Sequence, residues 1–219
     1  MIKEYIQKLF LNMAILNSNK STYKLFKFIN KIFGERNPGN IDFNFSSQPS
    51  RIEIVKFLLK YKAYNSYLEI GTFNDELFSK IDCKIKIGVD PYSGGNVRLT
   101  SDEFFKKNNQ KFDLIFIDGL HHYDQVIKDI SNSLKYLNSN GIILMHDCLP
   151  STIESQLVPR ISGNWNGDVW KAFLKQRKDP DLDSYTILAD EGIGAIFKRK
   201  NSNNLKFKIN NFKRLKYKF

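Results

Sequence analysis

Apolar and polar positions in the first third of the chain repeat with the period of a helix. Apolar side chains recur three and four positions apart over residues 2–16 and again over 23–33, which predicts two amphipathic helices before the turn-rich run at 37–40. Another helix is predicted from residue 51 to about residue 62, with Ser50 as its N-cap. The chain is therefore expected to open with helices rather than strands.

From residue 64 onward, short apolar runs alternate with stretches of helical period. This alternation is typical of a parallel sheet with helices on both faces. The runs predicted to be strands are at 66–71, 84–90, 112–118 and 141–146. A short edge strand is expected at 96–100, before a helix that starts near Ser101. The runs at 185–189 and 195–198 are expected to close the sheet as an antiparallel pair, joined by the turn Gly192-Ile193-Gly194.

The predicted fold class is α/β: a doubly wound, Rossmann-like, mostly parallel seven-stranded sheet with a C-terminal antiparallel strand pair, preceded by a helical extension. A chain of 219 residues suffices for one such domain with appendages. We expect a helical N-terminal extension at 1–47, one domain at 48–200 and a basic C-terminal tail at 201–219. The extension is expected to pack on the core or on a second copy, which predicts a homo-oligomer.

The formal charge of +11 is concentrated at the two ends of the chain. Residues 1–63 carry net +7 and residues 198–219 carry net +9, whereas the middle carries net −5. Basic ends could contact nucleic acid or an anionic membrane. Because the tail lacks a recognisable nucleic-acid module, we interpret the ends as solvated, leave peripheral membrane contact open and do not expect a nucleic-acid partner.

Cysteine usage and hydropathy indicate a cytoplasmic protein. Cys83 and Cys148 are far apart and form no metal-binding or disulfide pattern. No signal peptide is expected, because the first apolar run is short and lacks a cleavage site of small residues. No apolar stretch reaches the length of a membrane span.

A nucleotide-type site is predicted where the first strand ends in Glu69-Ile70-Gly71 and the second ends in Asp90. An acid about 20 residues after such a glycine can accept hydrogen bonds from ribose hydroxyls. A dinucleotide would need further glycines and a helix N-terminus facing its pyrophosphate. Phe73 and Asp75 stand there instead, and carboxylates at a helix N-terminus would repel phosphate. S-adenosylmethionine, which bears a sulfonium cation, is therefore favoured over NAD, although the motif alone also suits a tight turn with helix-capping acids.

Several motifs together resemble the class I S-adenosylmethionine-dependent methyltransferases, and more narrowly a small bacterial branch found with glycan or secondary-metabolite synthesis. The runs that carry the resemblance are YLEIGTF at 67–73, GVDP at 88–91, FDLIFIDGLHHYDQVIKDI at 112–130, GIILMHDCLP at 141–150 and NGDVWKAF at 166–173. The usual second and third glycines of the family loop are missing here. The resemblance implies an S-adenosylmethionine-dependent methyltransferase.

The resemblance also implies roles for residues of the cofactor side. Glu69 and Gly71 would line the methionine end, and Asp90 would hold the ribose. The residues that would complete this side are Thr72, Ser101, Asp102 and Asp118, with Ser101 or Asp102 near the adenine. For Ser101, a role as the N-cap of the next helix is an equal alternative.

Polar residues also follow the third and fourth strands, where the sheet opens into a ligand crevice. Asp118, His146 and Asp147 are expected to meet there, and such ligands suit Mg²⁺ or Mn²⁺. By resemblance to oxygen-directed methyltransferases, including those acting on catechols and macrolide sugars, Asp118 and Asp147 would bind the metal and His121 would be the catalytic base. His146 stands where the sugar enzymes have a carboxylate. The alternative is that Asp118 caps the following helix.

Aromatic and polar residues downstream indicate a surface for the acceptor. Trp165 and Asp168 suit a sugar, since aromatic faces pack on its C–H groups and carboxylates bind its hydroxyls. His122 is a further substrate candidate, with a plain surface position as its alternative. We therefore expect O-methylation of a hydroxyl on a sugar, glycan or related metabolite. The alternatives are an RNA methyltransferase, suggested by the basic ends, and a non-catalytic cofactor-binding domain of the same fold.

Overall fold

The computed structural model describes residues 24, 28, 43–160 and 163–205. The helix predicted at 2–16, nearly all of the one predicted at 23–33, and the tail beyond residue 205 lie outside the described residues. No helix within the described ranges is both long and apolar enough to cross a membrane.

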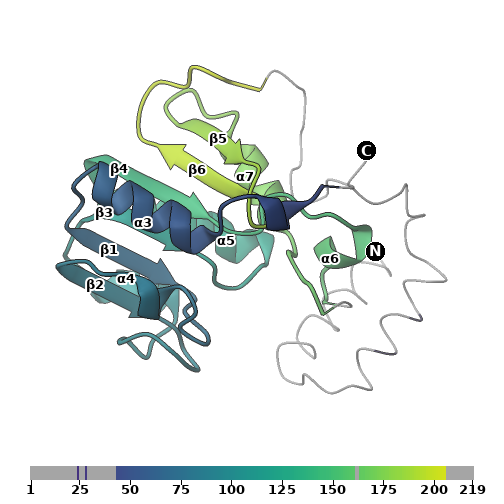
Figure 1. Ribbon diagram of the computed structural model, residues 1–219, viewed down its shortest axis with the longest axis horizontal. Coiled ribbons are helices and arrows are strands. Elements are labelled where there is room, and N and C mark those ends of the chain that lie inside the picture. The colour runs from purple at the N-terminus through teal and green to yellow at the C-terminus, as the bar shows by residue number, and fades with distance from the viewer. Residues whose placement is uncertain (1–23, 25–27, 29–42, 161–162, 206–219) are drawn as a thin grey trace.

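A six-stranded mixed sheet runs through the described part of the chain (Figure 1). Its strands are β1 (Ser66–Ile70), β2 (Ile85–Val89), β3 (Phe112–Ile117), β4 (Leu137–Met145), β5 (Asp183–Ile187) and β6 (Ile193–Phe197). The order across the sheet is β2-β1-β3-β4-β6-β5, in which the first four strands are parallel and β6 and β5 are antiparallel to their neighbours. The strand order reverses between β1 and β3. In α/β sheets ligands typically bind at such a point, beyond the carboxyl ends of the strands.

Two details of the predicted sheet are wrong. The described sheet has six strands rather than seven, because the run at 96–100 contributes only a bridge from Val97 to Val89. The Asn96 side chain occupies the edge of β2 instead, accepting from the Gly88 amide and donating to the Lys86 carbonyl. The turn between the last two strands lies at 188–192 rather than at Gly192-Ile193-Gly194, since Ile193 already belongs to β6.

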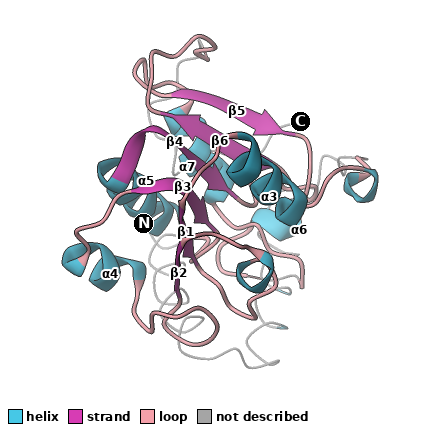
Figure 2. Cartoon of the chain, turned by 60° about the vertical axis from the view of Figure 1, so that its left-hand side comes forward, coloured by secondary structure: helices cyan, strands magenta, loops and turns pink. Residues whose placement is uncertain are grey.

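Helices cover both faces of the sheet, as the alternating pattern predicts (Figures 1 and 2). They are α3 (Arg51–Tyr61), α4 (Ser101–Lys107), α5 (Tyr123–Tyr136), α6 (Ile153–Gln156) and α7 (Val169–Gln176). On one face α3 packs Val55 and Leu59 against the sheet. On the other face α4, α5 and α7 contribute buried side chains such as Phe105, Ile130 and Phe173.

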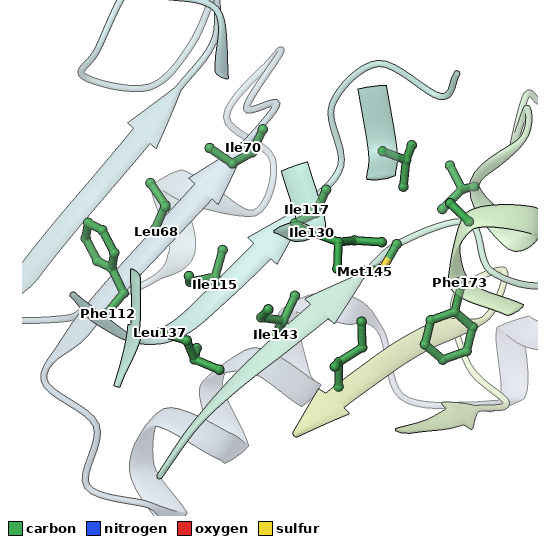
Figure 3. Packing of buried hydrophobic residues seen from close by; sticks show 14 of the residues in the cluster. Leu68, Ile70, Phe112, Ile115, Ile117, Ile130, Leu137, Ile143, Met145 and Phe173 are labelled. Atoms are coloured by element: carbon green, nitrogen blue, oxygen red, sulfur yellow. The ribbon is translucent and has the colours of Figure 1, made fainter. Parts of the chain in front are cut away.

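Successive side chains of the central strands point to opposite faces of the sheet, which produces two layers of core. Leu68, Ile115 and Ile143 point toward the face covered by α5 (Figure 3), whereas Tyr67 and Leu114 point toward α3. All five side chains have no solvent exposure. A strand buried on both faces reads as an almost continuous apolar run, which is why the sequence located these strands well.

Local hydrogen bonding explains where the helices begin. Ser50 caps α3 in a capping box with Glu53, as predicted. The N-cap of α4 is Thr100 rather than Ser101, because the Thr100 hydroxyl accepts from the Glu103 amide and the Glu103 carboxylate accepts from the Thr100 amide. The alternative role of Ser101 as N-cap is therefore wrong.

The loop after β1 does not lead into the helix that the sequence suggested. Phe73 and Asp75 have φ values of 45° and 62°, in the left-handed region that interrupts a right-handed helix. Only a 3₁₀ turn at Phe78–Lys80 follows. The Asp75 carboxylate accepts from the Gly95 amide at 2.6 Å instead of capping a helix. The prediction of acids at a helix N-terminus is wrong here, but the absence of a helix there also removes the usual cradle for a pyrophosphate.

Candidate functional site

The turns after β1 and β3 touch at the carboxyl edge of the sheet. Gly71 has φ +86°, and a Cβ added to it would lie 2.1 Å from the Asp118 carbonyl oxygen. Only glycine fits such an approach without displacing backbone. The predicted cofactor turn therefore adjoins the predicted acceptor rim directly.

Glu69 lies beneath this turn with 2% of its surface exposed. Burial raises the pKa of its carboxyl group to about 8, although the Tyr67 hydroxyl donates a 2.6 Å hydrogen bond that opposes the rise. Glu69 thus carries a proton at neutral pH in the absence of a nearby cation. A cationic ligand would favour its ionised form.

Asp90, predicted to hold a ribose, organises the two loops beside it. One carboxylate oxygen accepts from the Phe73 amide, and the other accepts from the amides of Tyr92 and Ser93, all within 3.0 Å. A carboxylate offers about four acceptor positions, so capacity for a ligand hydroxyl remains. Thr72 is buried under the same loops, with its hydroxyl directed to the Ser93 carbonyl.

Ser101 and Asp102, predicted to lie near an adenine, occupy the first turn of α4. The Gln125 side-chain amide donates to both residues and to Asp129, each at 3.0 or 3.1 Å. Lys128 forms an ion pair with Asp102. These contacts join α4 to α5 at the side of the sheet near β2.

Three donor atoms converge at the ends of β3 and β4. The Nε2 atom of His121 lies 3.3 Å from Asp118 Oδ1 and 3.2 Å from Asp147 Oδ2. Asp147 has φ +61°, a strained conformation for a non-glycine residue. Asp118 does not cap α5, whose N-cap is His122, so that alternative is wrong.

The tautomer of His121 follows from its neighbours. Its Nδ1 atom lies 2.8 Å from the Trp165 carbonyl oxygen, which can only accept, so Nδ1 carries hydrogen. The lone pair of a neutral Nε2 then faces two carboxylates. Burial lowers the pKa of His121, but Asp118 and Asp147 outweigh burial and raise that pKa above its ordinary value. The carboxylates therefore make its Nε2 a stronger base.

His146 lies on the other side of the same carboxylates. Its Nδ1 is 3.3 Å from Asp147 Oδ1 and 3.6 Å from Asp118 Oδ1, and its Nε2 is 3.1 Å from Asp190 Oδ1. Burial disfavours the charged imidazole, but the three carboxylates hold the pKa of His146 well above its usual range. The same imidazoles outweigh burial at Asp118 and keep the pKa of that carboxyl well below its usual range.

The substrate candidates lie beside this cluster. The Trp165 ring lies 5.2 Å from the His121 ring and 5.8 Å from the His122 ring, and its Nε1 donates to the Leu157 carbonyl. His122 is half-buried rather than a plain surface residue. Asp168 is buried, forms a 2.6 Å ion pair with Lys171, and donates its backbone amide to the His121 carbonyl.

Part of the chain that forms this site is similar to a known protein family. Residues 88–148, which run from β2 through the acidic rim to the end of β4, match the family model described as a methyltransferase domain. Over these residues the chain is therefore similar to methyltransferases.

A curated relative and two solved structures are similar to this chain. An uncharacterised protein R132 from Acanthamoeba polyphaga mimivirus is 29% identical over 131 residues, covering 44% of this chain and 58% of that protein. The O-methyltransferase from Bacillus cereus in complex with SAH has TM-score 0.50 and 13% identity, covering 90% of this chain and 97% of that one. Cofactor-bound Rv0187 from MTB has TM-score 0.51 and 14% identity, with coverage of 84% and 100%. At these identities the structures establish the fold alone.

The donor set at the ends of β3 and β4 fits a divalent cation. Ligand atoms of Asp118, His121 and Asp147 all lie within 4.8 Å of one another. Two carboxylates and an imidazole lone pair facing one point need a positive charge, which a metal or a proton can supply. The sequence predicted His146 as the third ligand, whereas the convergent set contains His121 in its place. The two nitrogens of His146 face the carboxylates of Asp118, Asp147 and Asp190 instead.

Sequence reasoning did not predict four residues to contact the acids of the rim: Arg51, Asn166, Asp190 and Glu191. Arg51 was recognised only as the start of α3, although its side chain reaches Asp190 and comes within 3.2 Å of His146. Asn166 lay inside a quoted motif but was given no partner. Nothing in the sequence indicated that the turn between β5 and β6 lies beside the rim, because its position there depends on β6 pairing with β4.

Proposed function

We propose that this chain transfers a methyl group from S-adenosylmethionine to a hydroxyl oxygen of an acceptor. The observation that carries the proposal is the convergence of His121 Nε2 with the carboxylates of Asp118 and Asp147 directly beside the Gly71 turn. This places a base and two anionic ligands next to a cofactor-type turn, so donor and acceptor would be held in proximity and alignment.

On the donor side, S-adenosylmethionine supplies an electrophilic methyl group on a sulfonium cation. Glu69 would become ionised beside that cation, because attraction between the carboxylate and the positive charge offsets the cost of burying the ionised form. Asp90 would accept from the ribose with the capacity that its backbone donors leave. The acidic rim also favours a cationic ligand over a dinucleotide.

On the acceptor side, His121 would take the hydroxyl proton as the oxygen forms its bond to the methyl carbon and the carbon–sulfur bond breaks. The Trp165 carbonyl keeps Nδ1 protonated and leaves Nε2 as the basic atom. Asp118 and Asp147 would hold Mg²⁺ or Mn²⁺, which would lower the pKa of the acceptor hydroxyl.

The proposed acceptor is a hydroxyl of a sugar, glycan or related metabolite. A half-buried tryptophan beside the base supports this class, since Trp165 is held by its own hydrogen bond and can offer its ring to sugar C–H groups. Asp168 and His122 border the same region and could bind further hydroxyls.

The test is transfer of labelled methyl to a panel of nucleotide sugars and glycans, with Mg²⁺, Mn²⁺ or EDTA. We expect transfer to at least one sugar hydroxyl, loss of that transfer in EDTA, and a fall of 10²-fold or more, on the order expected for loss of a general base, in His121→Ala. If His121 is the base rather than a ligand, His121→Ala retains Mn²⁺ binding. No transfer to any member of the panel would count against the acceptor class.

Calorimetry with S-adenosylhomocysteine tests the cofactor side independently of the acceptor. We expect binding in the wild type and its loss in Asp90→Ala. Binding without transfer to any acceptor would favour a non-catalytic domain of this fold, and no binding would contradict the cofactor assignment.

A further inference from the structure

Asn166 is a buried amide that holds two acids of the rim together. Only 1% of its surface is exposed. Its Nδ2 atom donates to Asp147 Oδ1 and to Glu191 Oε2, each at 2.5 Å. The amide therefore links the end of β4 to the turn between β5 and β6.

The orientation of this amide is decided by its partners. Two carboxylates can only accept, so the NH₂ group must face them and Oδ1 must face away. Oδ1 is buried and has no hydrogen-bond partner among the described residues. A buried acceptor without a donor lowers the stability of the protein. A ligand whose hydroxyl donates to Oδ1 would remove this cost.

The backbone around Asn166 fixes the base as well. In the clamp segment, which we define as residues 164–168, the Trp165 carbonyl accepts from His121 and the Asp168 amide donates to the His121 carbonyl. A Cβ added to Gly167 would lie 2.2 Å from that same carbonyl oxygen. The clamp segment is itself anchored, since the amides of Asn166 and Gly167 donate to the Ser155 carbonyl.

Asp147 needs such support because its own backbone is strained and its two oxygens serve different partners. Oδ2 faces His121, whereas Oδ1 lies against Asn166 and His146. A donor fixed on Oδ1 holds the carboxylate plane so that Oδ2 points into the cluster with Asp118 and His121.

We infer that Asn166 is a positioning residue that orients Asp147 for metal binding, an inference that rests on the proposed function. Residues that hydrogen-bond to a metal ligand typically change metal affinity by 10- to 100-fold when they are removed. Its Oδ1 remains as an acceptor for a hydroxyl of the bound acceptor or of water.

The test measures Mn²⁺ affinity by electron paramagnetic resonance in the wild type, Asn166→Ala and Asn164→Ala, together with the melting temperature of each. Asn164 is the matched control, because it is an amide of the same clamp segment that donates to the other carboxylate oxygen of Glu191, Oε1. We expect Asn166→Ala to weaken Mn²⁺ binding by about 10- to 100-fold while S-adenosylhomocysteine affinity stays within about twofold. Asn164→Ala should bind Mn²⁺ like the wild type.

Equal Mn²⁺ affinity in wild type and folded Asn166→Ala would overturn the role of Asn166 and leave the proposed function intact. Absence of Mn²⁺ binding in the wild type would overturn both the metal in the proposed function and this inference. If Asn166→Ala does not fold, Asn166→Leu, which keeps the branched shape of the side chain without the donor, is measured in its place, with the same expected loss.

Discussion

Burial raises the pKa of the Asp129 carboxyl group to about 6, so the folded chain must ionise a poorly solvated acid near neutral pH. This residue on α5 is 1% exposed and accepts from Gln125. Its folded pKa exceeds its unfolded value, so its contribution to stability is fully present below about pH 4 and is lost as the pH rises through 6.

We therefore predict that Asp129→Asn raises the free energy of unfolding at pH 8, by at most about 3 kcal/mol. Asparagine can still accept from Gln125 but does not ionise. The gain should disappear at pH 4, and urea unfolding at the two pH values measures it. A variant that is equally destabilised at both pH values would show that packing, rather than ionisation, dominates at this position.

Gly71 lies so close to the Asp118 backbone that a side chain at this position should disturb both turns. Gly71→Ala should lower stability by roughly 1–3 kcal/mol, since the new methyl group meets the Asp118 backbone and φ is unfavourable for alanine. It should also weaken S-adenosylhomocysteine binding. Gly163→Ala is the control because a Cβ there meets nothing within 4 Å. Thermal melting and calorimetry compare the two, and equal behaviour would contradict the proposed strain.

At the scale of elements, the N-terminus of α3 is fastened to the turn between β5 and β6. Asp190 accepts from the Arg51 backbone amide at 2.6 Å and from its guanidinium at 3.3 Å. The guanidinium also reaches Glu76, which is more than half exposed, in the loop after β1. One arginine thus joins three elements around the rim.

Asp190 and Glu76, the two acidic partners of Arg51, should contribute unequally to the free energy of unfolding. Asp190→Ala removes the acceptor of the Arg51 amide and of His146 Nε2, and we expect a loss of about 1–3 kcal/mol in the free energy of unfolding. Glu76→Ala removes an exposed pair and should cost less than about 1 kcal/mol. Urea unfolding of both variants checks this order, and a larger effect from Glu76→Ala would refute it.

At the scale of the whole molecule, the cofactor loops and the acidic rim belong to one sheet, so a ligand at its carboxyl edge should stabilise the entire domain. S-adenosylhomocysteine at 100 times its dissociation constant should add about 2.7 kcal/mol to the free energy of unfolding. NAD should leave the melting temperature unchanged, because no helix N-terminus follows β1 to receive a pyrophosphate. A shift with NAD and none with S-adenosylhomocysteine would reverse the ligand assignment.

Hydrophobic patterning and local motifs were enough to predict the strands of the parallel sheet, Ser50 as the N-cap of α3 and the meeting of Asp118 with Asp147. These features are local or follow from a rule of the fold: buried strands read as apolar runs, and parallel strands end at one edge. The loop after β1 was misjudged because two non-glycine residues adopt left-handed backbone conformations, which hydrophobic periodicity does not reveal.

The side chains that surround the rim acids could not be predicted from the sequence, because they are brought together by the packing of distant segments. Arg51, Asn166 and Asp190 come from segments far apart along the chain, and their convergence depends on α3 packing on the sheet and on β6 pairing antiparallel with β4. Hydrogen bonds between such segments leave no periodic trace in the sequence, because any of many polar residues could have filled each position.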